Sequence, residues 1–156
     1  MFRHLPRRYW ADPEATAASF IGGWTRTGDL GFVDEEGDLI MAGRSKELII
    51  RGGYNITPLE IETILHLHPA VQQAAVVGVP HDVLGEDVAA AVTIRPGASA
   101  TSDEIIAFCR THLADNKVPR TLLVLDEMPL NPNGKILKKE LGPVLAEAAK
   151  DSRKAA

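Results

Sequence analysis

The chain has 156 residues and a formal net charge of −4, a length that suffices for one domain with a core or for one small domain with an appendage. The acidic balance argues against nucleic-acid binding, which needs a concentrated basic surface, so the basic residues Arg3, His4, Arg7 and Arg8 are interpreted as a solvated terminus. No apolar stretch approaches the roughly 18–20 residues that span a membrane, and no apolar run follows the N-terminal arginines as a secretory signal requires, so we expect a cytoplasmic protein.

The first 28 residues do not have the pattern of an independent fold. A short helix is predicted over 12–18, and three large aromatic side chains are scattered among turn-forming residues: Trp10, Phe20 and Trp24. These side chains need a surface to pack against, and the segment is too short to supply one. Residues 29–42 have the pattern of a β-hairpin, because apolar residues flank a polar turn at 34–37.

The rest of the chain predicts a compact α+β domain, since strands and helices alternate unevenly. The expected elements are a strand at 48–51, a loop at 52–56, a helix at 57–67, strands at 71–79 and 87–95, a helix at 101–113, a strand at 121–125 and a helix that begins near residue 135. Two of the helices begin with the pattern of a capping box, Thr57-x-x-Glu60 and Thr101-x-x-Glu104. The end of the chain is rich in Ala and Lys, and we expect a frayed tail over 146–156.

Cys109 is the single cysteine, which excludes an internal disulfide and a cysteine-based metal site. It belongs to the apolar run 105–109 of a predicted helix. We therefore interpret it as a buried, inert thiol rather than a nucleophile. We assign no metal-binding residues.

Three charged residues lie at or near the ends of the predicted hairpin. The carboxylate of Asp29 can accept two ribose hydroxyls, although a tripeptide such as Thr27-Gly28-Asp29 is also common in turns. Arg44 offers a rigid fork of donors for ribose or phosphate oxygens, although most arginines are solvated charges. Lys46 falls where the hairpin ends and the next domain begins, which suits a hinge.

Two further features point to a ligand. The pair Gly52-Gly53 permits backbone conformations with φ > 0 and a close approach of a ligand to the main chain. Lys135 follows a dense turn signal at 131–134, so its side chain leaves a loop tip and can reach across a cleft. An ordinary surface lysine is the commoner interpretation of such a residue, but Pro129 and the apolar residues at 136–137 would anchor this loop against a core.

Four segments resemble, in the same order, the later core motifs of the acyl-CoA synthetases, a family in the adenylate-forming superfamily. They are Trp24-Thr25-Arg26-Thr27-Gly28-Asp29-Leu30, Gly43 to Gly53, Pro58-x-Glu60-Ile61-Glu62 and Pro129-x-Asn131-x-Asn133-Gly134-Lys135-Ile136. The resemblance covers about residues 9–141. It implies that residues 1–43 are the C-terminal remnant of a large AMP-binding domain, including the hairpin, that residues 44–46 are a hinge, and that residues 47–145 are a small C-terminal α+β domain with a short β-sheet flanked by helices.

In that family a carboxylate attacks the α-phosphate of ATP to give acyl-AMP and diphosphate, and the thiol of CoA then displaces AMP. The implied cofactors are ATP or AMP, CoA and Mg²⁺, with the Mg²⁺ ligands absent from this chain. A cation aimed at the α-phosphate oxygens lowers the barrier to adenylation. The matching positions imply that Asp29 and Arg44 bind the nucleotide, that Lys135 catalyses adenylation, that the domain rotates at Lys46, and that Gly52 and Gly53 line the pantetheine tunnel.

The sequence also departs from the family. Leu84 stands where many members carry an aromatic residue suited to the CoA adenine, residues 114–119 lack the aromatic that often precedes Lys117, and Lys46 stands where many members have Asp. The chain contains no phosphate loop rich in Gly, Ser and Thr. We therefore expect the C-terminal part of an acyl-CoA synthetase that is inactive alone.

Two alternatives stay open. The chain is also compatible with a non-enzymatic interaction module, or the small subunit of a split ligase, that binds a separate large subunit. The acceptor is either CoA or the pantetheine of a carrier protein. Malonate, a short or long fatty acid and an aromatic acid are all compatible substrates, because the acid pocket of the family lies in the large domain.

Overall fold

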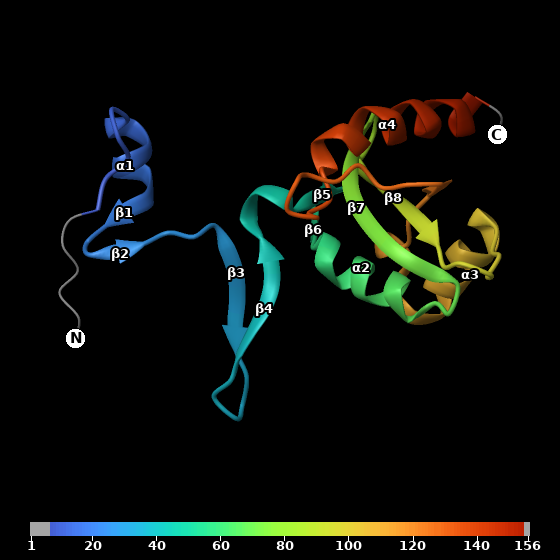
Figure 1. Cartoon of the computed structure of the whole chain (residues 1–156), viewed down its shortest axis with the longest axis horizontal. Coiled ribbons are helices and arrows are strands. Elements are labelled where there is room, and N and C mark those ends of the chain that lie inside the picture. The colour runs from blue at the N-terminus through green and yellow to red at the C-terminus, as the bar shows by residue number, and fades with distance from the viewer. Residues whose placement is uncertain (1–6, 155–156) are drawn as a thin grey trace. The chain divides into compact units, whose positions relative to one another are not determined.

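The chain, which this computed structural model describes over residues 7–154, divides into two units, Met1–Lys46 and Glu47–Ala156 (Figure 1). The second unit combines a β-sheet with helices on its faces, which confirms the predicted α+β class. The predicted hinge at 44–46 concerns motion between the units and stays a prediction.

The first unit consists of short elements: α1 (Pro13–Ser19), β1 (Phe20–Ile21), β2 (Trp24–Thr25), β3 (Asp29–Val33) and β4 (Leu39–Arg44). The helix begins as predicted, because the side chain of Asp12 accepts a hydrogen bond from the Ala15 amide. β3 and β4 pair antiparallel, which confirms the predicted hairpin. Asp34 Oδ1 closes the turn between them by accepting hydrogen bonds from the amides of Glu36 and Asp38.

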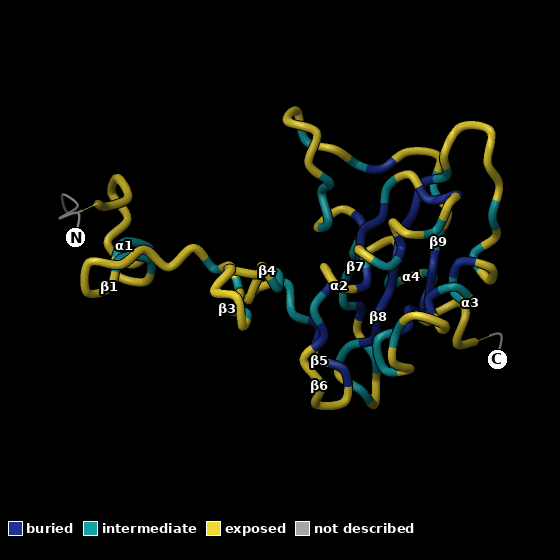
Figure 2. Tube along the Cα trace, turned by 90° about the horizontal axis from the view of Figure 1, so that it is seen from below, coloured by how far each residue is buried: buried dark blue, intermediate teal, exposed yellow. Residues whose placement is uncertain are grey.

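Over its described residues, 7–46, the first unit has no core of its own. No residue from 7 to 46 is buried, and Trp10 and Trp24 are 92% and 81% exposed. Figure 2 shows this part of the chain in exposed and intermediate colours throughout. Residues 7–46 therefore leave Trp10 and Trp24 without a surface to pack against, as the sequence predicts.

A five-stranded sheet organises the second unit. Its strands are β5 (Ile49–Arg51), β6 (Tyr54–Ile56), β7 (Val71–His81), β8 (Gly85–Ile94) and β9 (Thr121–Leu125). β8 is central: β7 runs antiparallel along one of its edges. The other edge pairs with β5 at Gly85 and with the parallel strand β9 over residues 89–93.

Three helices cover the sheet: α2 (Pro58–Leu67), α3 (Ser102–His112) and α4 (Lys138–Lys154) (Figure 1). Successive side chains of a strand point to opposite faces, so alternate residues of β8 belong to different cores. Val88, Ala90 and Val92 pack in the core that includes α2 and α3, whereas Ala89 and Ala91 pack in the core that includes α4. Both faces are covered, so the central strands are continuous apolar runs.

The predicted loop over 52–56 is wrong in part, because the chain turns within two residues and resumes as β6 at Tyr54. Arg51 pairs with Tyr54, which leaves Gly52 and Gly53 as the turn, with φ of +57° and +87°. A two-residue hairpin turn of this type requires φ > 0 at both positions. The glycine pair meets this requirement without steric cost.

The last helix differs from its prediction at both ends. α4 begins at Lys138 rather than near Lys135, and it continues through residues 146–154, where the sequence predicts a frayed tail. Leu141, Leu145 and Ala149 are buried against the sheet. These residues are four apart and form one apolar stripe of the helix, and packing of such a stripe stabilises a helix more than the propensity of its residues does.

The two predicted capping boxes have different outcomes. At α3 the hydroxyl of Thr101 accepts a hydrogen bond from the Glu104 amide, and the Glu104 carboxylate accepts one from the Thr101 amide, which confirms the box. At α2 the prediction is wrong, since the side chain of Thr57 makes no capping hydrogen bond. The carboxylate of Glu60 instead accepts two hydrogen bonds from Lys117 Nζ, at 2.7 and 2.8 Å.

We expect Thr101→Ala to lower the free energy of unfolding by about 1 kcal/mol, because a side-chain cap is lost. Thr57→Ala removes no such bond and is expected to cost less than about 0.5 kcal/mol. Urea unfolding followed by far-ultraviolet circular dichroism measures both changes. Equal losses in the two variants would contradict the assignment of a side-chain cap to α3 alone.

A buried ion pair links β5 to β8. Arg51 Nε lies 2.9 Å from Asp87 Oδ1, and both residues are buried. The same carboxylate oxygen accepts a hydrogen bond of 2.9 Å from the Val88 amide. The guanidinium of Arg51 also donates to the backbone carbonyls of Asp115 and Asn116, so it joins the sheet to the 3-10 turn η2 (Asp115–Lys117).

Candidate functional site

The structure brings together the two residues predicted to bind a nucleotide. Asp29 in β3 and Arg44 in β4 are partners in the hairpin register, and Arg44 Nε donates to Asp29 Oδ1 at 2.9 Å. The side chain of Arg44 is 61% exposed and that of Asp29 is 32% exposed. This pair orients a carboxylate while both groups remain accessible to a ligand.

The predicted hinge residue Lys46 lies immediately after the hairpin, in the 3-10 turn η1 (Ser45–Glu47). The turn is fixed to the residue that precedes β3, because the amide and the hydroxyl of Ser45 donate to the Gly28 carbonyl at 2.9 and 3.1 Å. Lys46 itself is exposed. It is the last residue of the first unit, and rotation at this point stays a prediction.

Lys135 lies at the end of a tightly bonded loop in the second unit. Asn131 organises this loop: its side-chain oxygen accepts from the amides of Asn133 and Lys135, each at 2.9 Å. Its backbone amide donates to the Lys135 carbonyl, and its carbonyl accepts from the Gly134 amide. The backbone of Lys135 is therefore held in place, while its side chain is exposed and has no ion-pair partner within residues 7–154.

The glycine turn between β5 and β6 lies against Leu84. The Gly52 amide donates to the Leu84 carbonyl at 2.9 Å, and a Cβ atom added to Gly52 would lie 3.4 Å from Leu84 Cδ2. A Cβ atom added to Gly53 would meet no atom of the described structure within 4 Å. The main chain at Gly53 is open to an approaching molecule, and a role for both glycines in a pantetheine tunnel stays a prediction.

Sequence reasoning missed one charged cluster, centred on Lys138 at the start of α4. Its Nζ lies 2.7 Å from Glu47 Oε2 and 2.8 Å from Glu62 Oε1. Burial alone would lower the pKa of Lys138, but the hydrogen bonds to Glu47 and Glu62 outweigh burial and raise this pKa above its ordinary value. The ammonium group therefore keeps its charge at neutral pH.

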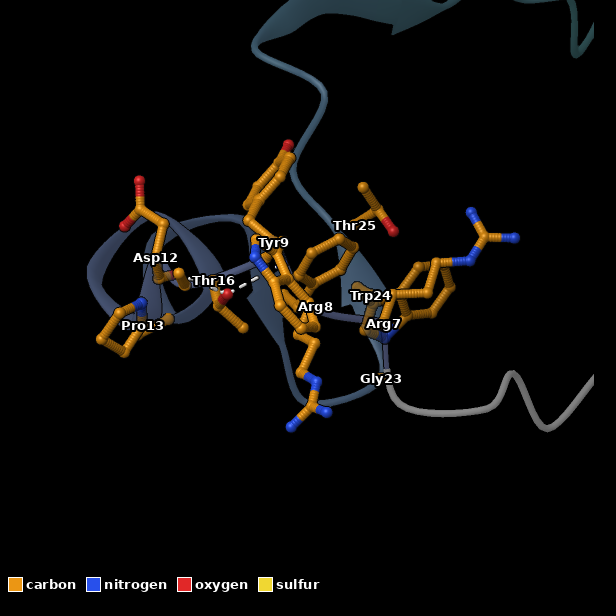
Figure 3. A pocket seen from close by; sticks show the side chains of 13 residues that line it. Arg7, Arg8, Tyr9, Asp12, Pro13, Thr16, Gly23, Trp24 and Thr25 are labelled. Atoms are coloured by element: carbon orange, nitrogen blue, oxygen red, sulfur yellow. Dashed lines mark hydrogen bonds between the residues drawn. The ribbon is translucent and has the colours of Figure 1, made fainter.

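A pocket of about 850 Å³ lies in the first unit. Its wall includes the aromatic side chains of Tyr9, Trp10, Phe20 and Trp24, and the rings of Tyr9 and Phe20 are 5.7 Å apart. Figure 3 shows the hydrogen bond from the Tyr9 amide to Thr16 Oγ1, at 3.0 Å, which links the chain at Tyr9 to α1. Neither Asp29 nor Arg44 lines this pocket. Because residues 7–46 form no core, we interpret the pocket as a packing surface rather than a substrate site.

The remaining sequence predictions concern a thiol, metals and membranes. Cys109 is buried in α3, and burial raises the pKa of its thiol to about 11, which agrees with an inert thiol. Within residues 7–154 no group of three His, Cys, Asp or Glu side chains is placed to hold a metal ion. In the same part of the chain, no helix has the length and apolar character needed to cross a membrane.

Comparisons with known proteins agree on one group of enzymes. A family model described as the AMP-binding enzyme C-terminal domain matches residues 60–135. The long-chain-fatty-acid–CoA ligase of Bacillus subtilis (strain 168) is 47% identical over 133 residues, which are 85% of this chain and 24% of that protein. The 2-succinylbenzoate–CoA ligase of Geobacillus kaustophilus is 43% identical over 88% of this chain and 28% of its own length.

Solved structures show the same similarity. ATP-bound MatB from Rhodopseudomonas palustris matches with a TM-score of 0.80 and 37% identity, over 88% of this chain and 28% of that one. The chain therefore spans about a quarter of the length of these proteins, and the match lies in their C-terminal portion.

Proposed function

The chain belongs to the adenylate-forming enzymes that carry the AMP-binding enzyme C-terminal domain, and from that premise we propose that it acts as the C-terminal part of an acyl-CoA synthetase. The proposed reaction converts a carboxylic acid, ATP and CoA into acyl-CoA, AMP and diphosphate through an acyl-adenylate. One observation carries the proposal. The loop at 131–135 presents a lysine cation on a fixed backbone, with no ion-pair partner in the described part of the chain.

Lys135 would act in the adenylation step. When the carboxylate attacks the α-phosphorus, negative charge is shared among the oxygens of the acid and of the α-phosphate, and a cation held beside them stabilises the transition state. A lysine suits this task because its ammonium group is a compact point charge. The hydrogen bonds of Asn131 reduce the freedom of the loop backbone, so less entropy is lost when the lysine enters the site.

Asp29 and Arg44 would bind the nucleotide. A carboxylate that is already oriented by an arginine can accept hydrogen bonds from two ribose hydroxyls, and the exposed guanidinium can donate to ribose or phosphate oxygens. The ATP-bound state of one structural relative supports a nucleotide as the ligand. We propose that the large domain of the family supplies the Mg²⁺ ligands.

CoA is the proposed acceptor, because the curated relatives are CoA ligases. Rotation at Lys46 would withdraw Lys135 after adenylation and bring the turn at Gly52 and Gly53 to the acyl-adenylate, so that one domain serves both half-reactions. The glycines would let the pantetheine thiol pass without obstruction by side chains. We propose that the protein acts in the cytoplasm, where ATP and CoA are available.

A second candidate function is that of the small subunit of a split ligase, and the first unit supports it. Trp10 and Trp24 are exposed, and residues 7–46 form no core, so this unit needs further polypeptide to pack against. That polypeptide is either a large domain in the same protein or a separate large subunit of a split ligase. Co-purification of this chain with a separately encoded large domain would support the split enzyme.

A hybrid ligase tests the proposed function. In the long-chain-fatty-acid–CoA ligase of Bacillus subtilis, the 133 aligned residues are replaced by the full chain. We expect the hybrid to form AMP and acyl-CoA from ATP, Mg²⁺, CoA and a long-chain fatty acid, whereas the chain alone and the host without its aligned residues form neither. A folded hybrid that binds ATP but makes no acyl-adenylate would overturn the proposal, and so would a full reaction cycle by the chain alone.

A further inference from the structure

Lys138 connects the Lys135 loop to the residue that follows the hinge position. It lies three residues after Lys135, at the first position of α4, and its ammonium group is hydrogen-bonded to the carboxylate of Glu47 at 2.7 Å. Glu47 is the first residue of the second unit, directly after Lys46. A single ion pair therefore spans 91 positions of the sequence and joins two points that the reaction would need to move together.

A second carboxylate anchors the same ammonium group to the body of the domain. Glu62 in α2 lies 2.8 Å from Lys138 Nζ, and its Oε1 also accepts a hydrogen bond of 2.8 Å from the Val76 amide in β7. The side chains of Lys138 and Glu62 are 27% and 15% exposed. A charge pair so shielded from water is screened less by solvent and salt than a surface pair is.

We propose that Lys138 is a positioning residue for Lys135. Its bonds to Glu47 and Glu62 hold the base of the 131–135 loop at a fixed place relative to the first residue of the second unit and to α2. Rotation at Lys46 then carries Lys135 as part of one rigid body, rather than as a loop that finds the nucleotide by its own motion. The inference rests on the proposed roles of Lys135 and Lys46, and it adds the residue that links them.

Spin labels on the chain itself test this role. Cysteines replace Asn133 in the loop and Thr63 on α2, both exposed, and Cys109 is replaced by alanine. Double electron–electron resonance then measures the distance distribution between the two labels. In Lys138→Met we expect this distribution to become about twofold wider, because the base of the loop loses its anchor and samples more conformations. Lys138→Arg keeps the charge and should restore the narrow distribution.

Lys117→Met is the matched control, since it breaks another bridging ion pair of the same domain, that with Glu60. We expect it to leave the distribution narrow. A distribution in Lys138→Met as narrow as in the parent would overturn the proposal, and so would equal widening in Lys117→Met. Where Lys138→Met does not fold, Glu47→Gln replaces it and carries the same expectation and the same contrary result. The measurement uses no nucleotide, so it stands or fails separately from catalysis by Lys135.

Discussion

Replacing Lys135 with alanine in the hybrid ligase is expected to slow acyl-adenylate formation by about 10²–10³, the usual cost of losing one group that stabilises charge in a transition state. The rate constant should fall while the KM for ATP changes little, since the interaction is made chiefly in the transition state. Rapid-quench measurement of acyl-adenylate, at saturating fatty acid and varied ATP, gives both quantities. Thermal unfolding of the variant should match that of the parent, because the Lys135 side chain is exposed.

The second half-reaction separates this role from a general loss of function. With synthetic acyl-adenylate and CoA supplied, Lys135→Ala should form thioester within about threefold of the parent rate, because Lys135 would be withdrawn at that step. Lys139→Ala is the matched control: Lys139 is exposed and belongs to no ion pair within residues 7–154. Equal losses in the two half-reactions, or an equal loss in Lys139→Ala, would contradict the assignment.

Replacing Arg51 with methionine is expected to lower the free energy of unfolding by about 3–5 kcal/mol, because removal of one partner leaves a buried charge uncompensated. The carboxylate of Asp87 would keep the Val88 amide at 2.9 Å and the more distant Arg120 Nε at 3.9 Å. The carbonyls of Asp115 and Asn116 would lose a donor as well. Urea unfolding of the 156-residue chain, followed by circular dichroism, measures the loss.

Two variants test whether burial is the cause. Arg120→Met removes the second partner of the Asp87 carboxylate. The side chain of Arg120 is 60% exposed, so its loss should cost less than about 1 kcal/mol. The double variant Arg51→Met, Asp87→Leu removes both buried charges and should recover much of the stability, because well-packed apolar groups often replace a buried ion pair without loss. A loss in Arg51→Met no larger than that in Arg120→Met would contradict this account.

Local signals in the sequence were enough to predict most elements of the second unit. The Thr101 capping box predicts the start of α3, and the apolar run at 121–125 predicts β9. The parallel pairing of β9 with β8 has no local signal, since it depends on which distant strands meet. The helical end of α4 was missed for a related reason: Leu145 and Ala149 are stabilised by the sheet beneath them rather than by their neighbours in sequence.

The residues of the candidate site also divide into those whose arrangement was predictable from the sequence and those whose arrangement was not. The proximity of Asp29 and Arg44 was predictable, because a hairpin places its two ends together; nucleotide binding by the two residues stays a prediction. The turn at 131–134 was predictable from its residue types, but the hydrogen bonds that the Asn131 side chain accepts were not. The hydrogen bonds of Lys138 were not predictable, because Glu47 and Glu62 are far from it in sequence.

The alternation of β8 between its two cores limits how this domain can vary in length. Val88, Ala90 and Val92 face one core and Ala89 and Ala91 face the other, so inserting or deleting one residue in the strand would exchange the two sets. Valines would then crowd the space under α4 that alanines now fill, and alanines would leave gaps beneath α2 and α3. Natural differences in length among such domains should therefore fall in the connections outside β7 and β8. The length of β8, which pairs with Arg51, and the length of the glycine turn should then be constant.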